Sequence, residues 1–167
     1  MIPFYEVLLF AGAALIMVLT PGPNMIYLIS RSTSQGPKAG VISLIGVVAG
    51  FLVHMFAAAL GLTVLFLTVP LAYEVLKWAG ALYLLWLAWQ AIKPGARSPF
   101  EAKEFPIDQP SRLLFMGFLT SALNPKVAVF YLAVLPQFIS AQHGSVFFQS
   151  IVLGLMQIAI SFSVNLL

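Results

Sequence analysis

Three long stretches of the sequence contain no Asp, Glu, Lys or Arg, and this feature restricts the chain more than any other. They cover residues 7–30, 39–73 and 127–167. A membrane-spanning helix needs about 20 mostly apolar residues, so each stretch is long enough to cross a bilayer. Composition agrees, because 61% of the residues are hydrophobic and 8% are charged, whereas a soluble domain has about 25% charged residues. We therefore predict an all-α integral membrane protein, a polytopic helix bundle.

Turn residues and polar segments divide the chain into five predicted helices. The expected spans are 4–30, 39–67, 71–92, 113–138 and 146–167. The segment 93–112 is the only long polar stretch, and it holds three of the five acids, four of the eight bases and four prolines. Such a composition is typical of an aqueous linker between membrane helices.

Lys and Arg gather in two of the predicted loops. The first loop holds Arg31 and Lys38, and the linker holds Lys93, Arg97, Lys103 and Arg112. The second and fourth loops hold no Lys or Arg. Loops rich in these residues stay in the cytoplasm. We therefore expect the first loop and the linker to be cytoplasmic and the N-terminus to be periplasmic.

Two of the predicted helices are interrupted at matching points. The sequence LTPGPNMIYL covers residues 19–28, and LTSALNPKVAVFYL covers 119–132; both have Asn four residues after Thr, with proline beside the Asn. Proline removes a backbone donor, and in lipid a broken backbone persists only where protein or a water-filled cavity satisfies it. The residues at which the helices are expected to break are Pro21, Gly22, Pro23 and Pro125.

Three helices separate the two breaks, so the second copy must be inverted in the membrane. Paired breaks in inverted halves point to a transport site near the midplane, although a structural kink or a chance match are alternatives. We predict a 3+3 inverted repeat with a first half at 1–92, a cytoplasmic linker at 93–112 and a second half at 113–167. Since this second half holds two helices, we expect a sixth helix to be absent from this chain.

The motifs TPGPN in the first helix and NPK in the fourth resemble the LysE/RhtB family of bacterial amino-acid exporters. The resemblance extends over essentially the whole chain, including the linker. It implies a six-helix, multi-pass protein of the bacterial inner membrane that exports small amino acids or their derivatives. The positions that match the motifs are Pro21, Gly22, Pro23, Asn24, Asn124, Pro125 and Lys126.

A binding site can be argued from the residues at the two breaks. Lys126 lies about 20 Å along its helix from the cytoplasmic Arg112, well inside a hydrocarbon core about 30 Å thick. A charge at that depth indicates function, and it can pair with a substrate carboxylate. Alternatively, Lys126 bonds freed backbone carbonyls and the two asparagines cap the half-helices. The predicted substrate-binding residues are Thr20, Asn24, Thr120, Asn124 and Lys126.

The charge of the spans restricts the substrate. No Asp or Glu lies deep in a predicted span, so a cationic substrate would bring an unpaired charge into a low dielectric. We expect a neutral amino acid, such as the homoserine, threonine or leucine classes that the resemblance allows. His54 is a candidate proton relay, although a hydrogen bond to a neighbouring helix is the commoner role for such a histidine.

Other functions lack the residues that they need. The chain has no Cys and two His, so a metal site, a cofactor site or a nucleophile with its base is not expected. The net charge of +3 reflects the cytoplasmic loops rather than nucleic acid. The expected partners are the bilayer and an amino acid, and a homo-oligomer is left open. The alternative is a membrane-embedded structural or interaction subunit with no transport of its own.

Overall fold

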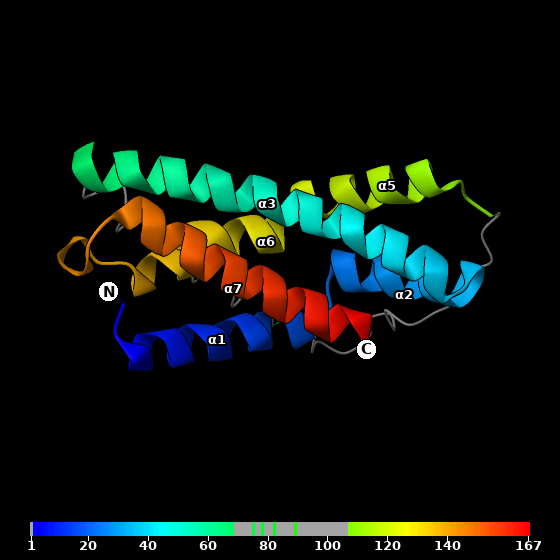
Figure 1. Ribbon diagram of the computed structural model, residues 1–167, viewed down its shortest axis with the longest axis horizontal. Helices are drawn as coiled ribbons and strands as arrows, with labels where there is room; N and C mark the ends of the chain where they lie inside the picture. Colours follow the sequence, from blue (N-terminus) through cyan, green and yellow to red (C-terminus); the bar gives the residue numbers. More distant parts are fainter. Residues whose placement is uncertain (1, 69–74, 76–77, 79–81, 83–88, 90–106) are drawn as a thin grey trace.

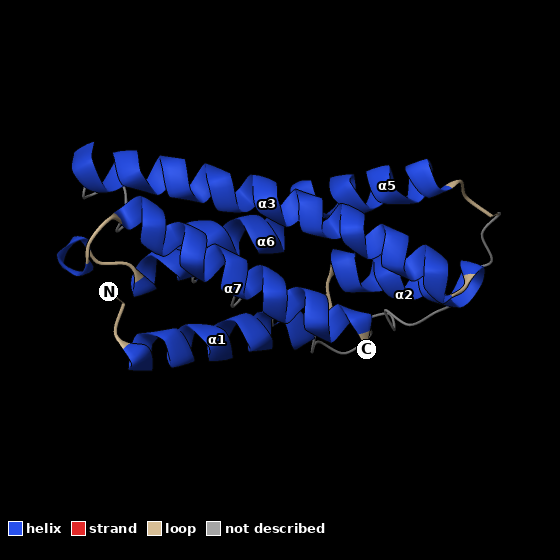
Figure 2. Cartoon of the chain, in the orientation of Figure 1, coloured by secondary structure: helices blue, strands red, loops and turns tan. Residues whose placement is uncertain are grey.

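The computed structural model describes residues 2–68 and 107–167, together with four positions between them. The predicted third helix at 71–92 and most of the linker at 93–112 therefore lie outside the described residues, apart from those positions and residues 107–112. Every regular element in the described part is helical (Figures 1 and 2). The prediction of an all-α membrane protein is confirmed.

Two long helices form the frame of the bundle. Helix α3 covers Pro37–Thr68, and α7 covers Val146–Leu166. Within the described residues, 37–61 and 146–166 are each long and apolar enough to cross a membrane alone. Helix α7 packs diagonally against α3 and α1, and these contacts close the centre of the bundle (Figure 1).

Both predicted breaks are present. Helix α1 (Phe4–Leu19) and α2 (Pro23–Gln35) are bent by 54° at residues 20–22. Helix α5 (Pro110–Ala122) and the segment Pro125–Phe138 are bent by 47° at residues 123–124. That last segment begins as an α-helix, α6 (Pro125–Val129), and continues as the π-helical η1 (Phe130–Val134) and the 3-10 helix η2 (Leu135–Phe138). Pro23 and Pro125 are each the first residue of the second half-helix, the position that tolerates a missing N–H.

Two predicted boundaries are wrong by a few residues. The loop expected at 31–38 is helical as far as Gln35, and α3 begins at Pro37, so Gly36 alone connects the two helices. Gly36 has φ 88°, a left-handed conformation that glycine adopts without strain, and proline is favoured at a first helical position. Helix α5 begins at Pro110, three residues before the expected start.

Helices α3 and α5 approach so closely that their contact requires glycine. A methyl group added at Gly46 would lie 2.1 Å from the Leu114 carbonyl oxygen, and one at Gly117 would lie 2.3 Å from the Ser43 carbonyl oxygen. At Gly50 the added carbon would lie 2.5 Å from Cβ of Ser121. Small residues that let backbones approach are typical of helix pairs in membranes. This packing fixes α5, and hence the second break, against the middle of α3.

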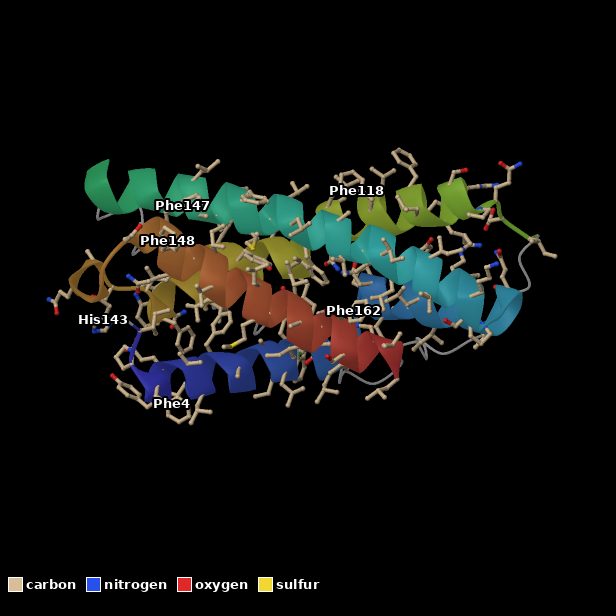
Figure 3. All side chains as sticks on the ribbon, in the orientation of Figure 1. Phe4, Phe118, His143, Phe147, Phe148 and Phe162 are labelled. Atoms are coloured by element: carbon tan, nitrogen blue, oxygen red, sulfur yellow. The ribbon has the colours of Figure 1, made fainter. Side chains whose placement is uncertain are left out.

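The outer surface of the bundle is rich in apolar side chains. Figure 3 shows Phe4 and Phe148 projecting from α1 and α7, and these side chains are 75% and 70% exposed. In water such a surface would favour aggregation, but in a bilayer it faces lipid. The core lies between α1, α3, the η1 segment and α7, with Phe10, Phe51, Phe130 and Leu153 among its buried side chains.

The loop that joins η2 to α7 contains one short 3-10 helix, η3 (Ala141–His143). This loop, the start of α1 and the far end of α3 lie together at the left end of the bundle in Figure 1. The α2–α3 connection and the start of α5 lie at the opposite end. The two breaks are between these ends, in the middle of the molecule.

Candidate functional site

The two breaks meet through their asparagines. The Asn124 side chain donates from Nδ2 to Oδ1 of Asn24 over 2.9 Å, and Asn24 donates from Nδ2 to Oγ of Ser121 over 3.3 Å. All three side chains are buried. Asn124 also caps α6, because its Oδ1 accepts a hydrogen bond from the Lys126 backbone N–H at 3.0 Å. Capping and contact between the halves are therefore combined in one residue.

Lys126 extends from the second break to the first. Its ammonium group donates to the backbone carbonyl of Thr20, a residue at the C-terminal end of α1. The C-terminal end of a helix carries partial negative charge and favours a cation. The same side chain covers Gly22, because a methyl group there would lie 3.2 Å from Cδ and 3.3 Å from Nζ of Lys126. The glycine of the first break thus leaves room for the lysine of the second.

A cavity of about 410 Å³ adjoins this contact. That volume lies within the range of small-molecule sites, about 300–1,000 Å³. Thr20, Asn124 and Lys126 supply its polar groups. The remaining wall is made by glycine, proline and apolar side chains of the breaks, α1 and η1, namely Ala13, Ile16, Met17, Pro21, Gly22, Pro23, Pro125, Phe130 and Val134. No Asp or Glu is among these described lining residues.

A smaller, more polar cavity of about 20 Å³ lies beside the asparagine pair, large enough for one water-sized molecule. Asn24, Asn124 and Lys126 line it, and α7 contributes Ser161 and Asn165. Ser161 and Asn165 are four residues apart, so they lie on one face of α7. The spacing of polar residues on this helix is the signal by which these two lining residues could have been found in the sequence.

His54 lies near the second break, on α3. Its Nε2 is 3.1 Å from the Ser121 carbonyl oxygen, and its ring stacks on that of Tyr131 with centroids 6.1 Å apart. Tyr131 in turn donates to Oε1 of Gln157 over 2.7 Å. The histidine thus has the hydrogen bond to a neighbouring helix that is common for this residue, and it does not line either cavity described above.

The structure brings together four of the five predicted binding residues. Thr20, Asn24, Asn124 and Lys126 line at least one of the two cavities. Thr120 is not among the lining residues, and its hydroxyl donates to the Met116 carbonyl of its own helix over 2.7 Å. The threonine that matches it, Thr20, contributes its backbone carbonyl, while its hydroxyl donates to the Ile16 carbonyl over 2.8 Å.

Known proteins resemble this chain along most of its length. Residues 15–166 match the family described as LysE type translocator. The chain belongs to this family. The LysE family description names translocators, which agrees with the prediction of transport rather than catalysis. Within the described residues, no group of three or more His, Cys, Asp or Glu is placed to hold a metal ion.

Curated relatives of this LysE-family chain are bacterial proteins named for efflux. The leucine efflux protein of Enterobacter sp. (strain 638) is 32% identical over 126 residues, which cover 75% of this chain and 60% of that protein. The leucine efflux protein of Salmonella choleraesuis (strain SC-B67) is 31% identical over 137 residues, which cover 81% of this chain and 65% of that protein. The chain thus spans about three fifths of these relatives' length. No solved structure matches it.

Proposed function

We propose that this protein is a secondary transporter that exports a neutral amino acid across the bacterial inner membrane, with the substrate bound between the two helix breaks. The observation that carries the proposal is the contact between the Lys126 ammonium and the Thr20 carbonyl. It places one strong donor and one strong acceptor, from different halves of the chain, against the same cavity.

The carboxylate and the ammonium of an amino acid can replace the two groups of this internal contact. In the proposed bound state, the substrate carboxylate accepts from Lys126, and the substrate ammonium donates to the Thr20 carbonyl. The C-terminal end of α1 favours that ammonium for the same reason that it favours the lysine. Asn24 and Asn124, which can each donate and accept, complete the polar end of the site. A zwitterion is therefore bound without a net change in the charge of the site.

The rest of the cavity favours an apolar substrate side chain. Its wall is mainly alanine, isoleucine, methionine, proline, phenylalanine and valine, and burying an apolar side chain there is favourable by about 25 cal/mol per Å². A lysine or arginine substrate would place a second cation among these groups without a partner. Leucine, the substrate in the names of the relatives, is neutral and aliphatic, and we propose it or a similar amino acid as the substrate.

The first test is counterflow of radiolabelled leucine in proteoliposomes with the Lys126→Ala variant. Loss of a hydrogen bond to a charged group costs about 1.5–3 kcal/mol, so we expect apparent affinity to fall roughly ten- to a hundredfold. Lys126→Arg should also transport poorly, because the planar guanidinium has a different shape and the Lys126 side chain already packs closely over Gly22. Lys38→Ala, which removes an exposed lysine, is the matched control. Wild-type counterflow by well-inserted Lys126→Ala would contradict the proposed site.

The second test uses analogues of the substrate. Because both ends of the zwitterion are recognised, N-acetylleucine and leucine methyl ester should each compete much more weakly than leucine. If either analogue competes as well as leucine does, the contact that the analogue lacks is not needed for binding, and that part of the proposal is wrong. Preferential transport of lysine would contradict the charge argument, and no counterflow with any amino acid would favour the structural or interaction subunit.

A further inference from the structure

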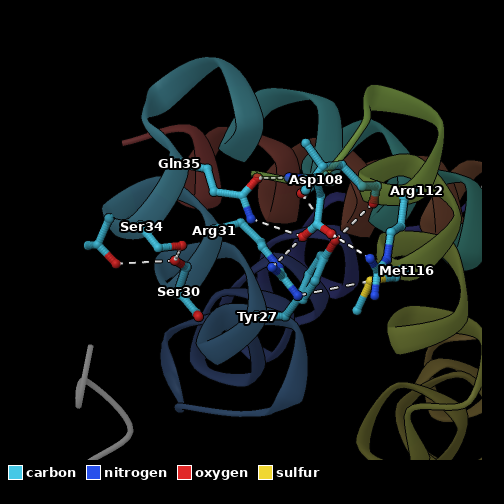
Figure 4. Close-up of polar contacts among 11 residues, drawn as sticks. Tyr27, Ser30, Arg31, Ser34, Gln35, Asp108, Arg112 and Met116 are labelled. Carbon is cyan, nitrogen blue, oxygen red and sulfur yellow. Dashed lines mark hydrogen bonds and ion pairs between the residues drawn. The ribbon is translucent and has the colours of Figure 1, made fainter. Parts of the chain in front are cut away.

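A second polar cluster lies outside the proposed site, at the end of the bundle where α2 meets the start of α5 (Figure 4). Asp108 is at its centre, with a side chain only 4% exposed. Arg31 forms an ion pair with it at 2.6 Å, and Gln35 exchanges two hydrogen bonds with it, at 2.9 Å through the carboxylate and 2.8 Å through the Asp108 backbone N–H. Arg112 completes the cluster at 3.1 Å.

The cluster is the outer end of a series of polar contacts that α2 makes with α5 and with Asp108 just before α5. From the site outward, Asn24 bonds Ser121, Tyr27 donates to the Leu113 carbonyl over 2.8 Å, and Arg31 and Gln35 bond Asp108. The α2 residues of this series are three or four positions apart, so they lie on one face of the helix. Arg31 also lies over the Tyr27 ring, 5.5 Å from its centroid. Separate hydrogen bonds therefore join this face of α2 to α5, and to Asp108 just before it, from the break to the helix end.

The two sides of the breaks therefore differ. The 410 Å³ cavity is lined by residues of the breaks, α1, α6 and η1, and by none from the parts of α2 and α5 beyond the breaks. In Figure 1, α1 and the α6–η1 segment lead from the breaks toward the end with the N-terminus, whereas α2 and α5 lead toward the opposite end. The site has a cavity on one side and a polar contact on the other.

The chemistry of this contact suits a reversible closure. A buried ion pair contributes little net stability, because desolvation offsets its attraction. Its groups are readily hydrated when they separate, unlike an apolar seam of the same length. The hydrogen bond from Gln35, followed by the charges of Arg31 and Arg112, holds the pKa of Asp108 below its ordinary value despite burial. The aspartate is therefore charged at neutral pH, and water can stabilise it in an open state.

We propose that Arg31, Gln35 and Asp108 form the cytoplasmic gate of the transporter, and that their contacts must separate before an amino acid from the cytoplasm reaches Asn24 and Asn124. The proposal rests on the export function proposed above. It assigns the structure to a state closed toward the cytoplasm, and it gives these three residues a role in access rather than in substrate binding.

The first experiment measures access without measuring transport. The chain has no cysteine, so Ser121→Cys is a single reporter at the inner end of the α2–α5 contact. We expect a membrane-impermeant maleimide, applied to inside-out vesicles, to label this cysteine several-fold faster when Asp108→Ala or Arg31→Ala is added. Arg112→Ala is the matched control, because its side chain is 66% exposed and its removal leaves Arg31 and Gln35 on Asp108. If the labelling rate is unchanged in both Asp108→Ala and Arg31→Ala, the gate proposal is overturned.

A charge swap guards against loss of folding. If Asp108→Ala fails to insert, the pair Arg31→Asp with Asp108→Arg should insert and restore slow labelling. If the swap inserts but is labelled as fast as the single variants, the ion pair does not control access. Faster labelling in a protein that never shows counterflow would leave the gate standing and contradict the export function, so the two failures are distinguishable.

The second experiment locks the gate. The double variant Gln35→Cys, Asp108→Cys is cross-linked with a short thiol-reactive reagent that contains a disulfide. We expect the cross-link to abolish leucine counterflow and its reduction to restore it. Ser140→Cys with Gln149→Cys is the matched control, because the native pair also joins an amide side chain to a backbone, at 2.8 Å and 3.2 Å, but links the loop only to the first turn of the α7 helix that follows it. Counterflow that continues through the cross-linked gate would overturn the proposal.

Discussion

Asn24 and Asn124 occupy matching positions in the two breaks but make different contacts. Asn124 caps α6 and donates to Asn24, whereas the Asn24 side chain accepts from Asn124 and donates to Ser121. The α2 N-cap is Gly22, which makes no side-chain hydrogen bond. Both asparagines therefore contribute to the contact between the two breaks, and Asn124 also caps a half-helix.

This difference predicts unequal costs of substitution. Either change to alanine removes the hydrogen bond between the two asparagines. Asn24→Ala also removes the 3.3 Å bond to Ser121, whereas Asn124→Ala removes the 3.0 Å bond that caps α6. A helix cap is worth about 0.5–2 kcal/mol, and the bond to Ser121 is the longer of the two, so we expect Asn124→Ala to lower the free energy of unfolding in detergent more than Asn24→Ala does. Equal values for the two variants would show that the cap contributes no more than the bond to Ser121.

At the scale of elements, the contact between α3 and α5 depends on glycine at three positions, Gly46, Gly50 and Gly117. A methyl group at Gly50 would lie 2.5 Å from Ser121 Cβ and 2.8 Å from the Ala122 backbone nitrogen. Backbone cannot move aside as a side-chain end does, so Gly50→Ala should force α5 away from α3. Since Ser121 also bonds Asn24 and lies beside His54, the first effect should be at the site.

We expect Gly50→Ala to lower the free energy of unfolding in detergent by about 1–3 kcal/mol, the usual cost of overpacking. Gly61→Ala in the same helix is the matched control, because the added carbon meets no described atom within 4 Å and alanine favours a helix by about 1 kcal/mol. The comparison isolates packing from helix propensity. A Gly50→Ala variant as stable as Gly61→Ala would show that the two helices have room to separate.

At the scale of the whole molecule, charge differs between the two ends. Arg31, Lys38 and Arg112 lie with a single described acid, Asp108, at the end that holds the α2–α3 connection and the start of α5. The described residues of the opposite end include Glu6 and His143. By the positive-inside rule, we expect the basic end to lie in the cytoplasm. Lys126 lies between the ends and takes no part in this asymmetry.

This orientation predicts which cysteines an external reagent reaches. In intact cells, an impermeant maleimide should label Gln142→Cys, an exposed position in η3, and should not label Thr33→Cys, an exposed position near the end of α2. Permeabilised cells should show labelling of both. Labelling of Thr33→Cys alone in intact cells would reverse the topology, and the proposed gate would then face the periplasm.

Much of this architecture follows from local sequence. Stretches without charge are long enough for membrane spans, and proline beside asparagine marks both points where a helix is interrupted. Spans and breaks were therefore predictable from composition and backbone chemistry. The helix boundaries at Gln35 and Pro110 were not predictable in this way. Helix α2 is extended by side chains that bond a distant segment. Arg31 and Gln35 bind Asp108, which is 77 and 73 residues away.

The sequence by itself determined that this protein is a membrane bundle with two matching breaks, because apolar length and proline act within a single helix. Only the tertiary structure decided which groups face each other there. Lys126 bonds the carbonyl of Thr20, 106 residues earlier, and Asn124 bonds Asn24, 100 residues earlier. Thr20 and Thr120 match in sequence but differ in surroundings. The physical reason is that pairing across the bundle depends on how α3, α5 and α7 pack, and no short segment specifies that packing alone.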